Sequence, residues 1–112
     1  MQVAIIIGHS FDSQGASSPY GIPPEWTYNL YVATLLPIEH QGIKIDWYFY
    51  DDFNNGYNNT VINKSKEINK KGYDAVLELH YNSFYNSQAN GTEACYYVDS
   101  KNGKMLADAF CI

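Results

Sequence analysis

A short apolar stretch near the start of the chain constrains the fold more than any other feature. Residues 3–7 read Val-Ala-Ile-Ile-Ile, in which four of five residues are β-branched, and Gly8 and His9 follow directly. Such a run is typical of a strand buried on both faces of an α/β sheet. We expect Gly8 to let the chain turn sharply, so that His9 lies just beyond the strand's carboxyl end. Ligands bind at that edge of open α/β sheets, so His9 is a candidate metal ligand or acid–base residue; the alternative is a loop histidine that makes only a backbone hydrogen bond.

Length and charge limit the classes of function. The chain has 112 residues, enough for one domain with a modest core. Its net charge of −5 argues against nucleic-acid binding, which requires a basic surface. No apolar stretch is long enough to span a membrane, and no basic segment typical of a signal peptide precedes the first strand. Cys95 and Cys111 lack the spacing of a metal or redox motif and are predicted to be buried thiols.

Strand and helix signals alternate along the rest of the chain. A helix is expected to follow the polar loop over 10–24, and a Lys-rich helix is expected to turn Ile62 and Ile68 inward. This alternation predicts an α/β sheet covered by helices on both faces. The expected elements are a helix over 24–36, a strand over 43–50, a helix over 61–71, strands over 75–80 and 92–98, and a final helix from Gly103.

Three side chains are brought to one edge by this order of elements. His9 follows the first strand, Glu25 opens the first helix, and His80 ends the strand over 75–80. Strand carboxyl ends and the amino ends of the following helices share an edge, so these residues can meet there. Two imidazoles and a carboxylate are the protein ligands of one class of catalytic zinc site, in which zinc activates water for amide or ester hydrolysis. Alternatively, Glu25 complements a helix dipole and His80 is a packed strand-end residue.

Glu78 alternates onto the same face as His80. A carboxylate inside a sheet is unfavourable unless it is paired or functional. It could orient His80 or act on a zinc-activated water, and a solvent-facing edge position is the simpler alternative.

The chain contains, in this order, Ile6-Ile7-Gly8-His9, Gly15-Ala16, Glu25, Asn29-Leu30, the block from Asp74 to Ser83, and Asn90-Gly91-Thr92-Glu93. Together these segments resemble the zinc-dependent N-acetylmuramoyl-L-alanine amidases of the amidase-3 family. The resemblance implies a three-layer fold of the phosphorylase/hydrolase-like type, with a mixed, mainly parallel sheet. It also implies Zn²⁺ held by His9, Glu25 and His80, peptidoglycan as partner, and Asn82 as a substrate-binding residue.

The sequence departs from the family pattern in ways that bear on catalysis. The loop before Gly15 is not Gly-rich, no arginine follows the strand over 43–50, and Glu78 stands where the family has a small polar residue. The family's catalytic glutamate lies on a late strand, and the sequence ends in the helix before it. The resemblance therefore implies one catalytic domain over 1–112 that lacks its last strand and helix, with Glu78 as the candidate general base. Glu93 is not a candidate on this ground.

Three functions fit these observations. The first is hydrolysis of the amide bond between N-acetylmuramic acid and L-alanine, by a phage endolysin held in the cytoplasm until release or by an exported autolysin whose N-terminal segment is missing. The second is a catalytically silent zinc- or peptidoglycan-binding fragment without a general base. The third is a zinc peptidase that cleaves the stem peptide. A sheet edge left free by missing strands would also favour a homodimer.

Overall fold

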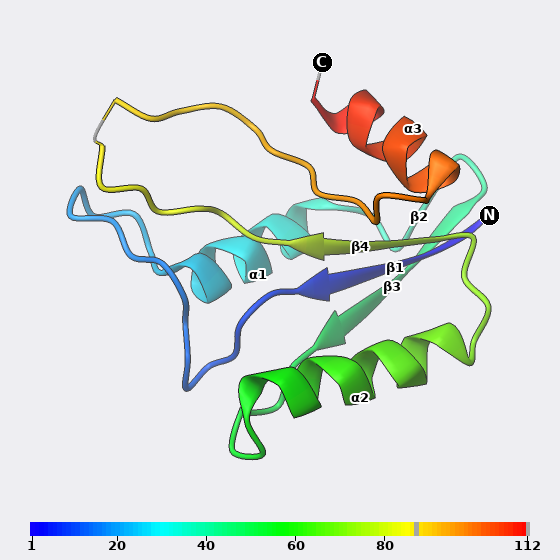
Figure 1. Ribbon diagram of the computed structural model, residues 1–112, viewed down its shortest axis with the longest axis horizontal. Coiled ribbons are helices and arrows are strands. Elements are labelled where there is room, and N and C mark those ends of the chain that lie inside the picture. Colours follow the sequence, from blue (N-terminus) through cyan, green and yellow to red (C-terminus); the bar gives the residue numbers. More distant parts are fainter. Residues whose placement is uncertain (87, 112) are drawn as a thin grey trace.

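Three parallel strands form the centre of the computed structural model, which describes residues 1–86 and 88–111. β1 (Gln2–Ile7) lies between β3 (Ile43–Phe49) and β4 (Ala75–Leu79), and the short β2 (Glu39–His40) pairs antiparallel with β3 at the edge (Figure 1). The strand order is β2-β3-β1-β4. The mixed, mainly parallel sheet that the sequence predicts is therefore confirmed.

The central position of β1 follows from its composition. All five residues from Val3 to Ile7 are buried, as expected for a β-branched strand with a neighbour on each side and a helical layer on each face. Ile6 pairs with Tyr48 of β3 on one side and with Glu78 of β4 on the other. These three side chains therefore share one face of the sheet.

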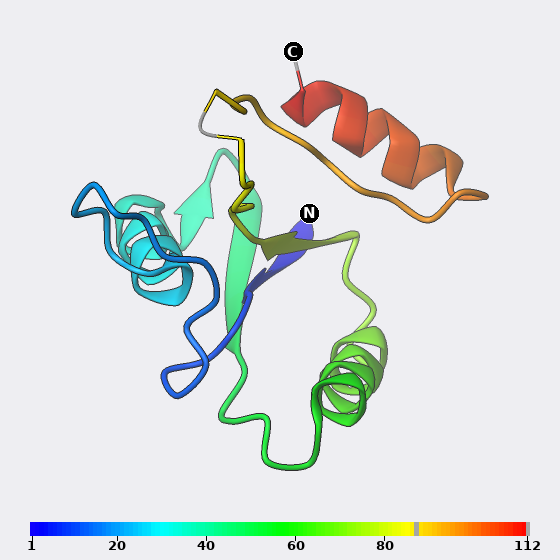
Figure 2. The ribbon, with the colours of Figure 1, turned by 60° about the vertical axis from the view of Figure 1, so that its left-hand side comes forward.

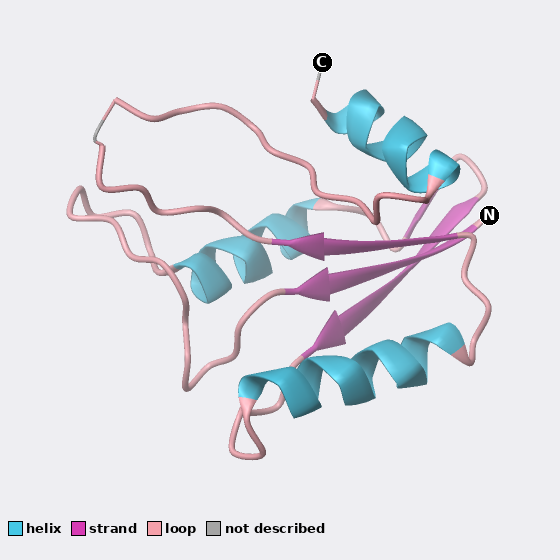
Figure 3. Cartoon of the chain, in the orientation of Figure 1, coloured by secondary structure: helices cyan, strands magenta, loops and turns pink. Residues whose placement is uncertain are grey.

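Helices cover the two faces of the sheet. α1 (Glu25–Leu35) and α2 (Tyr57–Asn69) lie on opposite sides, which gives the predicted three layers (Figures 2 and 3). α3 (Lys101–Phe110) begins two residues earlier than the sequence predicts, because the Ser100 hydroxyl caps it by accepting a hydrogen bond from the Gly103 N–H at 2.9 Å. No helix within residues 1–86 and 88–111 is both long and apolar enough to cross a membrane.

The main apolar core lies on the α2 face. Ala4 and Ile6 of β1 pack there with Tyr48, Tyr50 and Ile68. The prediction that Ile62 also faces inward is wrong: Ile62 is 49% exposed, and Val61 packs on the core instead. Val61 lies seven residues, about two helical turns, before Ile68, so the two share one stripe of α2.

Two further predictions about the last third of the chain are wrong. Residues 92–98 form no strand, so the outer edge of β4 has no strand partner among the described residues. Tyr97 and Val98 are exposed, and without an apolar face to bury, β-favouring residues gain little from joining the sheet. Cys95 and Cys111 are exposed rather than buried, because the segment and helix end that carry them lie at the surface.

His40 belongs to a strand that the sequence did not predict. No element is predicted between the helix over 24–36 and the strand over 43–50, but α1 ends at Leu35 and His40 lies in β2. Gln41 and Gly42, both with positive φ, make the turn from β2 into β3. His40 therefore lies beside the amino end of β3, at the opposite end of the sheet from His9 and His80.

Candidate metal centre

His9, Glu25 and His80 meet at the carboxyl edge of the parallel strands, as the sequence predicts. His9 Nε2 lies 3.2 Å from Glu25 Oε2, and His80 Nδ1 lies 2.8 Å from Glu25 Oε1. One ligand atom from each residue can be chosen so that all lie within 4.8 Å of one another. The two imidazole rings stand nearly perpendicular, with centroids 5.1 Å apart. The carboxylate therefore lies between two differently oriented imidazoles.

Glycines make room for these side chains. His9 itself has a φ of 66°, so the sharp turn expected at Gly8 occurs one residue later. Gly8 is needed for a different reason, because a Cβ there would overlap the His80 ring. At Gly15, whose φ is 74°, a Cβ would lie 2.6 Å from Glu25 Oε2. The left-handed backbone of His9, a residue other than glycine, is a local strain of a kind that is common at functional sites.

Glu25 is a buried carboxylate that contacts both candidate histidines. It opens α1 and is 2% exposed. The backbone N–H of Ala16 donates to its Oε2, and the backbone N–H of Tyr81 donates to its Oε1, each at 3.0 Å. A carboxylate is buried at such a position only when it is fully paired. The helix dipole alone does not explain the convergence of two imidazoles on this side chain.

His80 is bound by carboxylates at both ring nitrogens. Nε2 lies 3.0 Å from Glu78 Oε1, while Nδ1 faces Glu25. The hydrogen bond to Glu78, and then that to Glu25, raise the pKa of His80 above its ordinary value, although burial acts in the opposite direction. The contact between Glu78 and His80 agrees with the expectation that both side chains face the same cleft.

Glu78 is in turn held by Tyr50. The Tyr50 hydroxyl donates to Glu78 Oε1 at 3.2 Å, and Tyr50 is 3% exposed. Burial, and then the charge of Glu78, raise the pKa of Tyr50, so the phenol stays protonated and acts as the donor.

Sequence reasoning missed three residues that hold the site together. The Asn29 side chain donates to the Leu79 carbonyl at 3.1 Å, which ties α1 to the end of β4. The Tyr81 hydroxyl donates to the carbonyls of Pro23 and Ala16, at 2.7 and 3.1 Å. Tyr50 directly follows β3, so the strand-end rule that selected His9 and His80 would also have found it.

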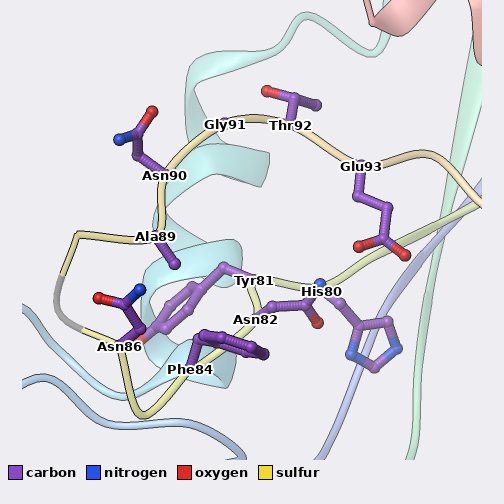
Figure 4. Close-up of a pocket in the computed structure, with 10 residues that line it drawn as sticks. All are labelled: His80, Tyr81, Asn82, Phe84, Asn86, Ala89, Asn90, Gly91, Thr92 and Glu93. Carbon is purple, nitrogen blue, oxygen red and sulfur yellow. The ribbon is translucent and has the colours of Figure 1, made fainter.

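A cavity of about 820 Å³ opens beside His80. Asn82, one of its lining residues, extends its side chain toward His80, and the Glu93 carboxylate points toward the same side (Figure 4). The walls combine aromatic rings with amides and small residues. The lining residues are His80, Tyr81, Asn82, Phe84, Asn86, Ala89, Asn90, Gly91, Thr92 and Glu93.

The donor set fits a zinc ion. Imidazole nitrogens and carboxylate oxygens are ligands that zinc favours, and three protein ligands leave a fourth position for water or substrate. His80 borders the cavity, so that fourth position has a route to solvent. The missing side chains at Gly8 and Gly15 also keep the space around the three ligands clear.

Comparison with known proteins identifies the family. The amidase-3 family model, described as N-acetylmuramoyl-L-alanine amidase, matches residues 3–111. Neither the curated proteins nor the solved structures gave a match. The family match supports a peptidoglycan amidase function in general, and the family is generally zinc-dependent. It covers nearly the whole chain, including all three candidate ligands, and we conclude that the chain belongs to the amidase-3 family of N-acetylmuramoyl-L-alanine amidases.

Proposed function

We propose that the chain is a zinc-dependent hydrolase of the amide bond between N-acetylmuramic acid and L-alanine, with His9, Glu25 and His80 as the zinc ligands. The observation that carries this proposal is the Glu25 carboxylate, which is 2% exposed and has an imidazole on each side. Outside a metal or catalytic site, an arrangement that buries a charge and directs two histidines at it has little structural value.

The ligand set suits hydrolysis. When bound at such a site, zinc lowers the pKa of a water molecule and polarises a carbonyl oxygen. One carboxylate and two neutral imidazoles offset only one of the two positive charges of the ion. The backbone N–H groups of Ala16 and Tyr81 hold Glu25 in place, so the ligands are ordered before substrate arrives.

The cavity beside His80 is the proposed substrate site. Tyr81 and Phe84 offer ring surfaces to a sugar or a peptide, and Asn82 offers a group that both donates and accepts hydrogen bonds. Asn82 is two residues from His80, so an amide held by its side chain would lie close to the proposed zinc ligands. We therefore assign Asn82 to substrate binding.

Cell-wall lysis is the proposed setting, and the same chemistry would serve an endolysin or an autolysin. The test is release of new amino-terminal L-alanine from purified peptidoglycan with zinc supplied. Wild type and His40→Ala should release it, because His40 is exposed at the other end of the sheet, whereas His80→Ala should not. His40→Ala is the matched control for the loss of an imidazole.

The other outcomes separate the alternatives. New amino termini within the stem peptide would identify a peptidase and contradict the proposal. Binding of zinc and peptidoglycan without release of L-alanine would also contradict it, and would favour a silent binding fragment. Release that persists in His80→Ala would exclude the proposed ligand set.

A further inference from the structure

We infer that Glu78 and Tyr50 are positioning residues of the zinc centre: Tyr50 fixes the Glu78 carboxylate, which accepts a hydrogen bond from His80 Nε2–H, so that His80 offers Nδ1 to the metal. The inference rests on the proposed zinc site. It assigns a function to two residues that come from the opposite face of the sheet from Glu25.

The two nitrogens of His80 face different groups. Nδ1 is 2.8 Å from Glu25 Oε1, on the side where the three candidate ligands converge, and Nε2 is 3.0 Å from Glu78 Oε1. A neutral imidazole carries one proton, and the hydrogen bond made by one nitrogen decides which nitrogen is free to bind a metal. A proton on Nε2 satisfies Glu78 and leaves the Nδ1 lone pair free to bind a metal ion that Glu25 also binds.

The hydrogen bonds that the two carboxylates already accept favour the tautomer of His80 with its proton on Nε2. Glu25 already accepts backbone N–H groups at both of its oxygens. Glu78 accepts from Tyr50 and is otherwise paired only with His80 among the contacts of the described residues. Glu78 therefore gains more from the imidazole proton than Glu25 does.

Tyr50 gives Glu78 a fixed position. The Tyr50 side chain is part of the buried core with Ile6 and Tyr48, and its ring packs against Phe53 at a centroid distance of 5.3 Å. Glu78 pairs with Ile6 across β4 and β1, which places it on the same face. The core thus fixes the phenol, the phenol fixes the carboxylate, and the carboxylate orients the imidazole.

This role differs from that of a general base. Oε1 of Glu78 is the atom that meets both Tyr50 and His80, so the carboxylate is directed at the ring of a proposed ligand. Carboxylates that hold the distal nitrogen of a metal-binding histidine typically contribute about 10- to 100-fold to metal affinity. A general base would contribute to turnover and leave zinc affinity nearly unchanged.

The first test measures the zinc dissociation constant by competition with a chromophoric chelator, with thermal unfolding of each metal-free variant to confirm folding. Glu78→Ala should weaken zinc binding about 10- to 100-fold. Glu78→Gln should restore most of the affinity, because its amide oxygen still accepts from Nε2–H, and Tyr50→Phe should lose less than Glu78→Ala. Glu67→Ala is the control, because that glutamate pairs with Lys64 on α2.

The second test is ¹⁵N NMR of the histidine rings in the zinc-loaded protein. The inference predicts that His80 carries its proton on Nε2 in wild type and that this signal exchanges faster with water in Glu78→Ala. A proton on Nδ1 of zinc-loaded His80 would overturn it.

Failure of the inference and failure of the proposed function are distinguishable. Unchanged zinc affinity in Glu78→Ala, with L-alanine release lost, would overturn the positioning role and make Glu78 the general base of a functioning amidase. Absence of zinc binding by the wild type would overturn both.

Discussion

The two faces of the sheet are built on different principles. The α2 face is an apolar layer, in which Ile6 of β1 packs with Tyr48 and Ile68. On the other face, the buried residues of α1 are Glu25 and Asn29, which are both polar. α2 is therefore held by apolar burial, whereas hydrogen bonds to strand and loop backbone are a large part of what holds α1.

Stability and chemistry are thus separated across one sheet. The α2 face supplies the rigid layer, and the α1 face uses buried polar groups to bring Glu25 to the strand ends. His80 connects the two, because it contacts Glu25 from the α1 side and Glu78 from the α2 side. Substitutions on the two faces should therefore fail in different ways.

The largest effect is expected from Glu25→Gln. The amide keeps the shape of the side chain but lacks the charge, and two imidazoles alone are a poor zinc site. Zinc content after dialysis should fall from about one ion per chain to background. Glu39→Gln, at an exposed position of β2, should keep its zinc. Full zinc retention by Glu25→Gln would contradict the metal-binding role of the buried charge on the α1 face.

Next in size is Ile68→Ala on the α2 face. Ile68 is 1% exposed, and truncation of such a residue costs about 2–5 kcal/mol of unfolding free energy. Zinc affinity of the folded fraction should be unchanged. Urea titration measures the unfolding free energy. Ile62→Ala, at a 49% exposed position of the same helix, is the control. Equal destabilisation by the two variants would contradict the account of the core.

A smaller effect is expected from Asn29→Ala. The Leu79 carbonyl keeps the hydrogen bond from the Gly8 N–H at 3.1 Å, so the expected cost is about 1 kcal/mol. Because the bond ties α1 to β4, zinc affinity should also fall, unlike in Ile68→Ala. Asn59→Ala removes a side-chain amide bond from α2 to the Asn55 carbonyl, which lies just before that helix, and should leave zinc affinity unchanged. An Asn29→Ala variant with wild-type zinc affinity would show that this bond does not position Glu25.

The smallest effect concerns Tyr73 at the edge of the α2 face. Its hydroxyl donates to Asp46, and this bond, then that with Tyr48, raise the pKa of Tyr73 above its ordinary value. The stabilisation is therefore complete below the ordinary tyrosine pKa near 10 and is lost as pH rises through the raised value. Tyrosinate absorbance should show one late-titrating group fewer in Tyr73→Phe. A difference spectrum in which Tyr73 ionises at the ordinary pKa would contradict this.

Much of the site follows from local sequence. β1 was predictable because five consecutive apolar residues leave few alternatives, and His9, Glu25 and His80 followed from the rule that strand ends share an edge. The contact between Tyr50 and Glu78 was not predictable in the same way, because it joins β3 and β4 across β1 and depends on strand register. The strand predicted over 92–98 does not form. The composition of these residues favours a strand, but strand pairing also needs a partner strand and a buried face.

Anomalous diffraction at the zinc edge, from crystals grown with zinc, would locate the metal and its protein ligands directly. We expect one strong peak per chain, with His9 Nε2, a Glu25 oxygen and His80 Nδ1 as protein ligands and with Glu78 Oε1 hydrogen-bonded to His80 Nε2. A peak at other residues, or no peak from zinc-saturated crystals, would contradict the proposed centre. A peak bound through His80 Nε2 would keep the centre and contradict the positioning role of Glu78.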